Sequence, residues 1–163
     1  MKVTVHDSIA AIPAGEWDAL VGNGYPFLSH AFLELAERTG SVSPDAGWSP
    51  KHLVLRDGNT LRAAMPLYEK THSWGEFVFD WAWAQAYQQA GFDYYPKLVS
   101  AVPFTPAPSS RMLRADARDD EAATILVEAA TELARETGCS SFHVLFPTDD
   151  EIPALEQAGL LIR

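Results

Sequence analysis

Ionisable side chains stand among aromatic residues between His72 and Lys97. This segment holds nine of the chain's eighteen aromatic residues within 26 of its 163 positions, and Glu76, Asp80 and Asp93 are set between them. An ordinary core is aliphatic with few charges, whereas a ligand pocket joins apolar walls to a few orienting polar groups. The composition favours a pocket, and a Trp- and Tyr-rich core whose polar tips reach water stays open as the alternative.

Other chemistries find little support in the sequence. His72 and Glu76 stand four apart, but Trp74-Gly75 between them argues against a helix and no third ligand is evident, so no metal site is predicted. Cys139 follows Gly138 at a predicted helix end, where the helix dipole raises a thiol pKa and disfavours a nucleophile. No phosphate-binding or dinucleotide fingerprint occurs.

Length and charge limit the class of protein. A chain of 163 residues is most simply one domain. Eleven acidic and two basic residues between 116 and 156 account for nine of the ten net negative charges, which disfavours duplex nucleic acid and anionic membranes as partners. The absence of a long apolar run, of a signal-peptide pattern and of a second cysteine predicts a cytoplasmic protein without disulfides.

Local signals divide the chain into alternating elements. Ser29 is suited to cap a helix, Asp57-Gly58 suits a tight hairpin turn, and apolar residues recur at helical spacing after Asp119. The predicted order is a strand over 2–6, a helix from Pro13 ended by Gly22 and Gly24, a helix from Ser29 to Gly40, a hairpin of 51–56 with 60–69, a helix over 81–90, a strand over 97–102, a helix over 119–137, a strand over 141–146 and a helix from about Asp150.

This order predicts an α/β or α+β fold with a mixed, largely antiparallel central sheet flanked by helices. The apolar residues 160–162 look like the beginning of a further strand. We therefore expect residues 1–163 to form one domain that is the first part of a longer protein, or a domain that receives a strand from a partner.

The element order resembles that of the acyl-CoA N-acetyltransferase (GNAT) superfamily. Shorter motifs are similar to one uncharacterised bacterial family, the Fem-like, GNAT-type N-acyltransferases assigned to peptidoglycan biosynthesis. The matching motifs are Ser29-His30-Ala31-Phe32-Leu33, Pro66-Leu67-Tyr68, Lys70, His72-Ser73, Gly75-Glu76, Phe79-Asp80-Trp81, Tyr94-Tyr95-Pro96-Lys97 and Val102-Pro103-Phe104-Thr105-Pro106. The resemblance implies the first of two GNAT-like lobes, partnered by the second lobe or by a homodimer, and a small-molecule or peptide amine substrate.

Acyl transfer to an amine requires a base. Glu76 and His72 are the candidate bases, and Asp80 is a candidate for orienting the amine. Each has a structural alternative: Asp80 as a helix cap, His72 as a surface loop residue and Glu76 as the partner of Lys97. The candidate substrate-binding residues are Trp81, Trp83, Tyr87, Tyr94, Tyr95, Lys97, Phe104 and Thr105.

The sequence does not favour a coenzyme A site in this chain. A coenzyme A pyrophosphate normally lies on a glycine-bearing loop at a helix N-terminus, but residues 103–110 contain no glycine and the next helix opens with Asp119, Asp120 and Glu121. The positive charges of Arg111 and Arg114 offset the repulsion between these carboxylates and a phosphate only in part. We expect acyl-CoA or aminoacyl-tRNA to serve the full-length protein without binding tightly here. A non-catalytic ligand-binding or scaffold domain and a self-contained acetyl-CoA-dependent N-acetyltransferase remain as alternatives.

Overall fold

The computed structural model describes residues 1–23 and 25–163 and contains two four-stranded sheets. The first sheet is antiparallel throughout, in the order β1 (Lys2–His6), β3 (His52–Asp57), β4 (Thr60–Met65) and β7 (Leu113–Arg114). The β3–β4 hairpin turns at Gly58, whose φ of 56° lies in the left-handed region, so the turn predicted from Asp57-Gly58 is confirmed.

The second sheet has the order β2 (Trp48–Pro50), β5 (Tyr68–Lys70), β6 (Lys97–Ser100) and β8 (Phe142–Val144). Its β6–β8 pair is parallel and its other pairs are antiparallel. The prediction of one continuous strand over 60–69 was wrong, because the chain leaves the first sheet after Met65 and enters the second sheet at Tyr68. Pro66 lies at this break, where its missing N–H removes a ladder bond.

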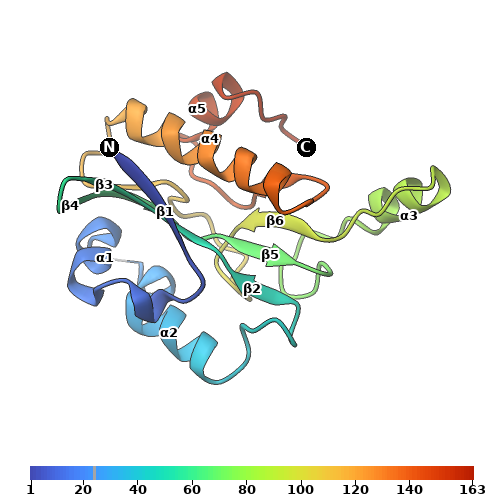
Figure 1. Cartoon of the computed structure of the whole chain (residues 1–163), viewed down its shortest axis with the longest axis horizontal. Helices are drawn as coiled ribbons and strands as arrows, with labels where there is room; N and C mark the ends of the chain where they lie inside the picture. Colours follow the sequence, from blue (N-terminus) through green and yellow to red (C-terminus); the bar gives the residue numbers. More distant parts are fainter. Residues whose placement is uncertain (24) are drawn as a thin grey trace.

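Helices cover both sides of the sheets (Figure 1). On one side lie α1 (Ala14–Val21) and α2 (His30–Arg38), with the short 3-10 helices η1 (Ile9–Ala11) and η2 (Pro26–Leu28). On the other side lie α4 (Asp120–Glu136) and α5 (Ile152–Gln157). Leu126 of α4 is fully buried against Leu53 and Leu55 of β3, and Trp17 of α1 packs in a second core with Val54. The predicted α+β architecture is confirmed.

The helix ends follow the predicted signals. The Ser29 hydroxyl accepts a hydrogen bond from the backbone N–H of Phe32 and caps α2, and α1 ends at Gly22, whose φ is 71°. Gly24, the second predicted stop, lies outside the described residues. Pro153 lies in the first turn of α5, where it removes no helical hydrogen bond.

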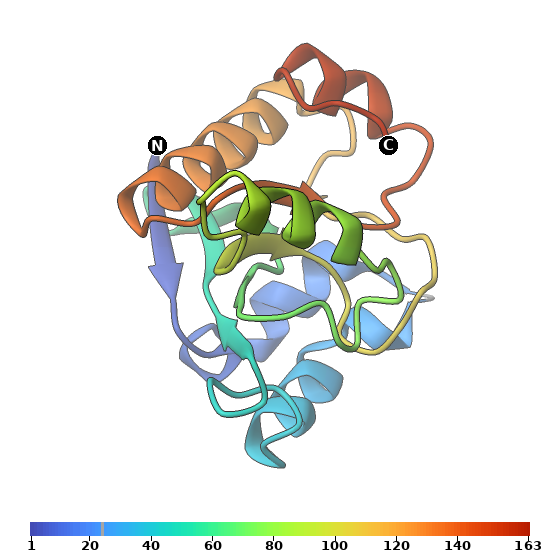
Figure 2. The same cartoon turned by 90° about the vertical axis from the view of Figure 1, so that its right-hand side faces the viewer.

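Helix α3 (Trp81–Gln89) stands apart from these layers and projects from the body next to the second sheet (Figures 1 and 2). It has no buried residue. Residues 160–162 are irregular rather than a strand, and Leu161 and Ile162 are exposed, so that prediction was wrong. In the described part of the chain, no helix is both long and apolar enough to cross a membrane.

Candidate functional site

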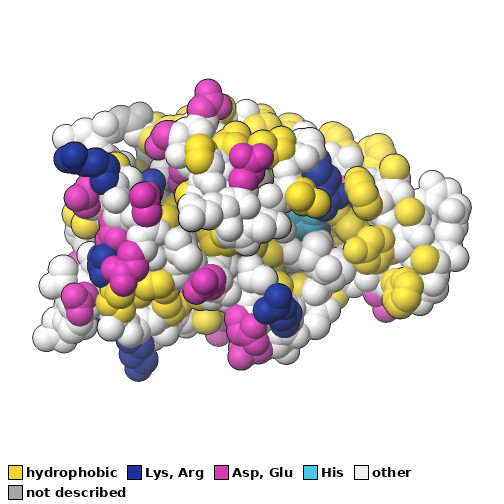
Figure 3. All heavy atoms as spheres, turned by 90° about the horizontal axis from the view of Figure 1, so that it is seen from above, with side chains coloured by type: hydrophobic (Ala, Val, Ile, Leu, Met, Phe, Trp, Pro, Cys, Tyr) yellow, Lys and Arg dark blue, Asp and Glu magenta, His cyan; other side chains and the backbone are white. Residues whose placement is uncertain are grey.

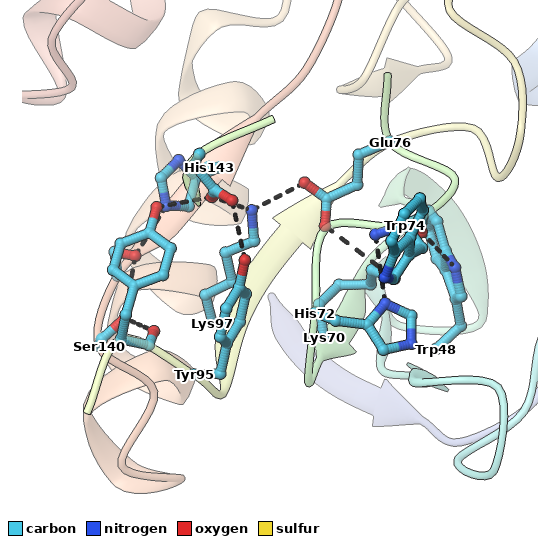
Figure 4. Close-up of polar contacts among 12 residues, drawn as sticks. Trp48, Lys70, His72, Trp74, Glu76, Tyr95, Lys97, Ser140 and His143 are labelled. Atoms are coloured by element: carbon cyan, nitrogen blue, oxygen red, sulfur yellow. Dashed lines mark hydrogen bonds and ion pairs between the residues drawn. The ribbon is translucent and has the colours of Figure 1, made fainter. Parts of the chain in front are cut away.

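A buried chain of alternating charges lies at one end of the second sheet (Figure 4). Lys97 Nζ donates a 2.7 Å hydrogen bond to Glu76 Oε2 and lies 2.5 Å from Asp80 Oδ2, while Lys70 Nζ lies 4.0 Å from Glu76 Oε1. None of the four residues is more than 8% exposed. Burying a charge costs free energy unless it is paired, so the positions of these groups depend on one another.

The strand register explains why a carboxylate lies between the lysines. Lys70 at the end of β5 stands directly opposite Lys97 at the start of β6. Like charges opposite one another destabilise a sheet. The connection between these two strands carries Glu76, whose carboxylate lies within 4.0 Å of both ammonium groups. The Glu76–Lys97 pairing foreseen as an alternative to a catalytic role is therefore present.

Asp80 is held by hydroxyl groups as well as by Lys97. Tyr94 Oη donates to Asp80 Oδ2 at 2.7 Å, and Tyr95 Oη donates to Oδ1 at 2.9 Å. Burial alone would raise the pKa of Asp80, but the hydrogen bonds from Lys97 and Tyr94 lower it to about 2. Asp80 precedes α3, yet its side chain makes no cap hydrogen bond. The helix-cap interpretation of its carboxylate was therefore wrong.

Glu76 and Lys70 form the inner end of the chain of charges. Burial raises the pKa of Glu76 against the opposing effect of Lys97. Glu76 Oε1 accepts no hydrogen bond from the described residues. Lys70 Nζ lies 3.7 Å from the centroid of the Trp48 ring and donates to the carbonyl of Trp74 at 3.2 Å. Burial lowers the pKa of Lys70 to about 7 although Glu76 opposes the shift, so this amine is partly neutral at neutral pH.

His72 lies beside Lys70 and Trp48 rather than in the chain of charges (Figure 4). Its Nδ1 accepts a hydrogen bond from the backbone N–H of Trp74 at 3.2 Å, and its ring fills the space next to Gly47. Burial lowers the pKa of His72. The structure therefore places two of the three candidate catalytic residues, Glu76 and Asp80, around Lys97, and places His72 on the far side of Lys70.

Two residues of this region escaped the sequence analysis as site candidates. Lys70 was noted only within a motif, although Tyr68 and Lys70 share the buried face of β5 at a spacing of two. His143 lies on β8 opposite Val99, its Nε2 is 2.7 Å from Ser141 Oγ, and its ring centroid is 6.4 Å from that of Tyr94. Burial, and to a smaller extent the positive charge of Lys97, lowers the pKa of His143 to about 4. The imidazole is therefore neutral at neutral pH.

The predicted substrate-binding residues separate into three groups. Tyr94, Tyr95 and Lys97 surround Asp80, and Tyr87 packs on Tyr94 with ring centroids 5.1 Å apart. Trp81 and Trp83 point outward from α3 and are exposed. Phe104 packs on Trp48 at 5.6 Å beside Gly75, and the Thr105 hydroxyl donates to the carbonyl of Pro103.

The two cavities described in this structure do not coincide with the expected pocket. Cavities of about 510 Å³ along α4 and about 470 Å³ beside α2 are lined by none of the predicted site residues. Within residues 1–23 and 25–163, no group of three or more His, Cys, Asp or Glu side chains is arranged to hold a metal ion.

The N-terminus of α4 does not fit a phosphate group. The Asp119 carboxylate accepts the N–H of Ala122 at 3.0 Å and pairs with Arg62, which also pairs with Glu121 at 2.9 Å. Carboxylates stabilise this positive helix end and repel a second anion from it. Arg114 lies 3.7 Å from Asp120, so its charge is also partly offset.

Arg111 is not at this helix end, which corrects its assignment as a cofactor-binding candidate. Its guanidinium is fully buried and donates to the carbonyls of Leu145 at 2.8 Å and Ser109 at 3.0 Å. The buried Glu151 carboxylate accepts the backbone N–H groups of Arg111 and Met112 and holds this loop in place. Arg111 is therefore committed to the protein's own backbone.

The fold is similar to that of a solved N-acetyltransferase. The structure resembles the apo crystal structure of an aminoglycoside antibiotic 6′-N-acetyltransferase from Acinetobacter haemolyticus with a TM-score of 0.58 and 12% identity, over 99% of this chain and 92% of that chain. Residues 8–163 match the FemAB-like family model, described as peptidoglycan biosynthesis and recognition, and the chain belongs to that family. The resemblance drawn from the sequence is confirmed. Comparison with curated proteins gives no significant match.

Proposed function

We propose that this chain is the acceptor-binding lobe of a two-lobed, cytoplasmic N-acyltransferase, which transfers an acyl or aminoacyl group to an amine of a cell-wall precursor. The observation that carries the proposal is the buried Glu76 carboxylate, which has a raised pKa and one oxygen without a hydrogen-bond donor in the described structure. The GNAT-type fold supports acyl transfer, and the family description supports a peptidoglycan-related substrate.

The charges around Glu76 suit an ammonium substrate. When Lys70 is neutral, Glu76, Asp80 and Lys97 together hold two negative charges and one positive charge. The resulting net negative charge attracts an ammonium group, and low-dielectric surroundings strengthen that attraction. Glu76 Oε1 is the acceptor for the proton that the amine must lose before it can attack, either directly or through one water molecule. Asp80 is held by Tyr94 and Tyr95 and also pairs with Lys97. This pairing keeps Lys97 on the other oxygen of Glu76, Oε2.

A second candidate function is ligand binding without catalysis. The carboxylates at the N-terminus of α4 favour it, because they occupy the position where a coenzyme pyrophosphate would lie. The same observation disfavours a self-contained acetyl-CoA-dependent enzyme. An acyl-CoA or aminoacyl-tRNA donor used by the full-length protein would then be held by its other lobe.

Calorimetric titration of the purified chain tests the proposal. The two ligands are a cell-wall stem peptide with a free side-chain amine and the same peptide acetylated on that amine. We expect the free amine to bind at least about tenfold more tightly, since acetylation removes the charge that the carboxylates recognise. Glu76→Gln should abolish the difference. Equal affinity for the two peptides, or no binding of either, would contradict the proposal.

A titration with acetyl-CoA separates the alternatives. Micromolar binding of acetyl-CoA by this chain would restore the self-contained enzyme. Amine binding by this chain, together with no acyl transfer by the full-length protein, would identify a ligand-binding domain.

A further inference from the structure

Residues 74–92, here called the arm, expose an aromatic surface that the proposed chemistry does not use. Six aromatic side chains of the arm are each between 50% and 68% exposed: Trp74, Phe77, Phe79, Trp81, Trp83 and Phe92. The rings of Phe79 and Trp81 lie 4.9 Å apart, and the Trp74 ring lies 6.2 Å from that of Trp81. Hydrophobic side chains gather at the α3 end of the molecule, and Asp and Glu lie mostly over the rest of that face (Figure 3).

The composition of α3 is that of an interface rather than of a solvent-facing helix. No Asp, Glu, Lys or Arg occurs from Trp81 to Phe92, whereas helices that face water normally carry charges. An isolated helix shorter than about 12 residues is marginal in water, and α3 has nine residues, none of them buried. Exposed tryptophans without charges are typical of the centre of a protein interface. Ala82 and Ala86, which are exposed and four residues apart on one face of α3, leave room for close approach of a second helix.

The size of the surface approaches that of one side of a stable interface. Each aromatic side chain buries about 150–250 Å², so six half-exposed rings present on the order of 600 Å² before the alanines and glutamines of α3 are added. The largest patch on a typical monomer is about 300–600 Å², and a standard interface buries about 800 Å² on each partner. The six rings of the arm alone therefore expose about as much apolar surface as the largest patch on a typical monomer.

Charge decides which partner fits. No Lys or Arg occurs between Thr71 and Pro96, and the single Arg163 over the Trp83 ring is not the cluster of basic residues that an anionic lipid surface requires. A second copy of the chain carries the same formal charge of −10, but nine of those charges lie within residues 116–156. The arm points away from α4 and α5 (Figure 1). A two-fold pairing of arms brings neutral surfaces together, and the acidic bodies stay apart and are screened by salt beyond about 8–10 Å.

We propose that the arm is the dimerisation surface of this chain, with α3 of one copy packed on α3 of a second copy. Phe79 and Trp81 are the anchors, because Arg163 already covers the Trp83 ring at 4.4 Å. The partner also covers Trp74, whose carbonyl accepts a hydrogen bond from Lys70, so the paired surface adjoins the buried chain of charges. The proposal goes beyond the acyltransferase function and does not depend on it.

Sedimentation equilibrium of the ligand-free chain over a range of concentrations tests the proposal. We expect the mass to rise from 17.9 kDa to twice that value and no further. Trp81→Glu and Phe79→Glu should each raise the dissociation constant at least about 30-fold, as expected for an interface hot spot. Leu35→Glu, an equally drastic change at an exposed position of α2, is the matched control and should leave the dissociation constant unchanged.

Three results would overturn the proposal. The chain could remain at 17.9 kDa at all concentrations, its mass could rise without limit, or Leu35→Glu could dissociate it as effectively as Trp81→Glu. Circular dichroism checks that the variants fold, which is expected because Phe79 and Trp81 are exposed and belong to none of the three hydrophobic cores. Peptide binding is measured separately, so failure of dimerisation and failure of the proposed function are distinguishable.

Discussion

Lys97 lies between two carboxylates in the buried chain of charges. Glu76 and Asp80 both lie within hydrogen-bond distance of its ammonium group. The pairing offsets most of the desolvation cost of all three groups. Removal of Lys97 therefore has a different consequence from removal of an exposed lysine, because the Glu76 and Asp80 carboxylates would lose the cation that lies between them.

Lys97→Met should destabilise the protein by about 3–5 kcal/mol, the usual result of removing one partner of a buried ion pair. Urea unfolding measures the change. Arg135→Met is the matched control, because Arg135 pairs with Glu132 at 3.1 Å on the exposed face of α4 and such pairs contribute less than about 1 kcal/mol. Equal losses in the two variants would show that the buried chain of charges is not formed in solution.

The lowered pKa of Lys70 predicts that the free energy of unfolding depends on pH. Its folded pKa of about 7 lies below the ordinary value of 10.5, so between these values the unfolded chain binds a proton that the folded chain lacks. Stability should therefore rise with pH from about 7 to about 10.5. The charged groups facing Lys70 are Glu76, Lys97 and Asp80, and Lys70→Met should remove this rise.

Carbon-13 NMR of the lysine Cε atoms gives the direct measurement. We expect one signal with a midpoint near 7 that is lost in Lys70→Met, which assigns it. A Lys70 midpoint near the ordinary value of 10.5 would contradict the buried position of the amine.

At the scale of elements, the first turn of α4 shows why a helix N-terminus need not be an anion site. Asp119 caps the helix through the N–H of Ala122 and is itself neutralised by Arg62. Asp119→Ala should cost about 1 kcal/mol of stability, the usual value for an N-cap. Asp119→Asn keeps a capping oxygen and should cost less. Thermal unfolding compares the two variants, and equal losses would show that the charge rather than the cap stabilises this turn.

Elements with local signals were predictable from the sequence. Ser29, Gly58 and the apolar spacing of α4 each act within a few residues, and each prediction is confirmed. The break between β4 and β5 was missed because strand pairing with β6, far along the chain, determines where β5 lies. Local sequence can suggest a turn at Pro66 but does not determine which sheet follows.

The same limit applies to the candidate site. The aromatic and ionisable composition identified Glu76, Asp80, Tyr94, Tyr95 and Lys97, which the structure brings together. Asp80 is the N-cap residue of α3, as predicted, but its carboxylate makes no cap hydrogen bond and is bound by Lys97, Tyr94 and Tyr95. Lys70 and His143 were missed because their proximity to Lys97 arises from strand register, which a single sequence does not reveal.

At the scale of the whole molecule, the protein combines a well-packed body with a helix that lacks its own core. The body buries Leu53, Leu55 and Leu126 completely, so its amides exchange only through large openings. Helix α3 has no comparable contacts, and in a single copy its amides should exchange rapidly. Covering by a second copy would slow that exchange without altering the body.

Hydrogen exchange at two concentrations should separate these behaviours. Raising the concentration through the dissociation constant should slow exchange of the α3 amides at least about tenfold, because opening then requires loss of the partner as well. The β3 amides should not change. Trp81→Glu, which keeps the body intact, should exchange its α3 amides rapidly at both concentrations. Slow α3 exchange in the dilute wild-type chain would mean that the helix is stabilised within one copy, and its exposed rings would then need a different partner.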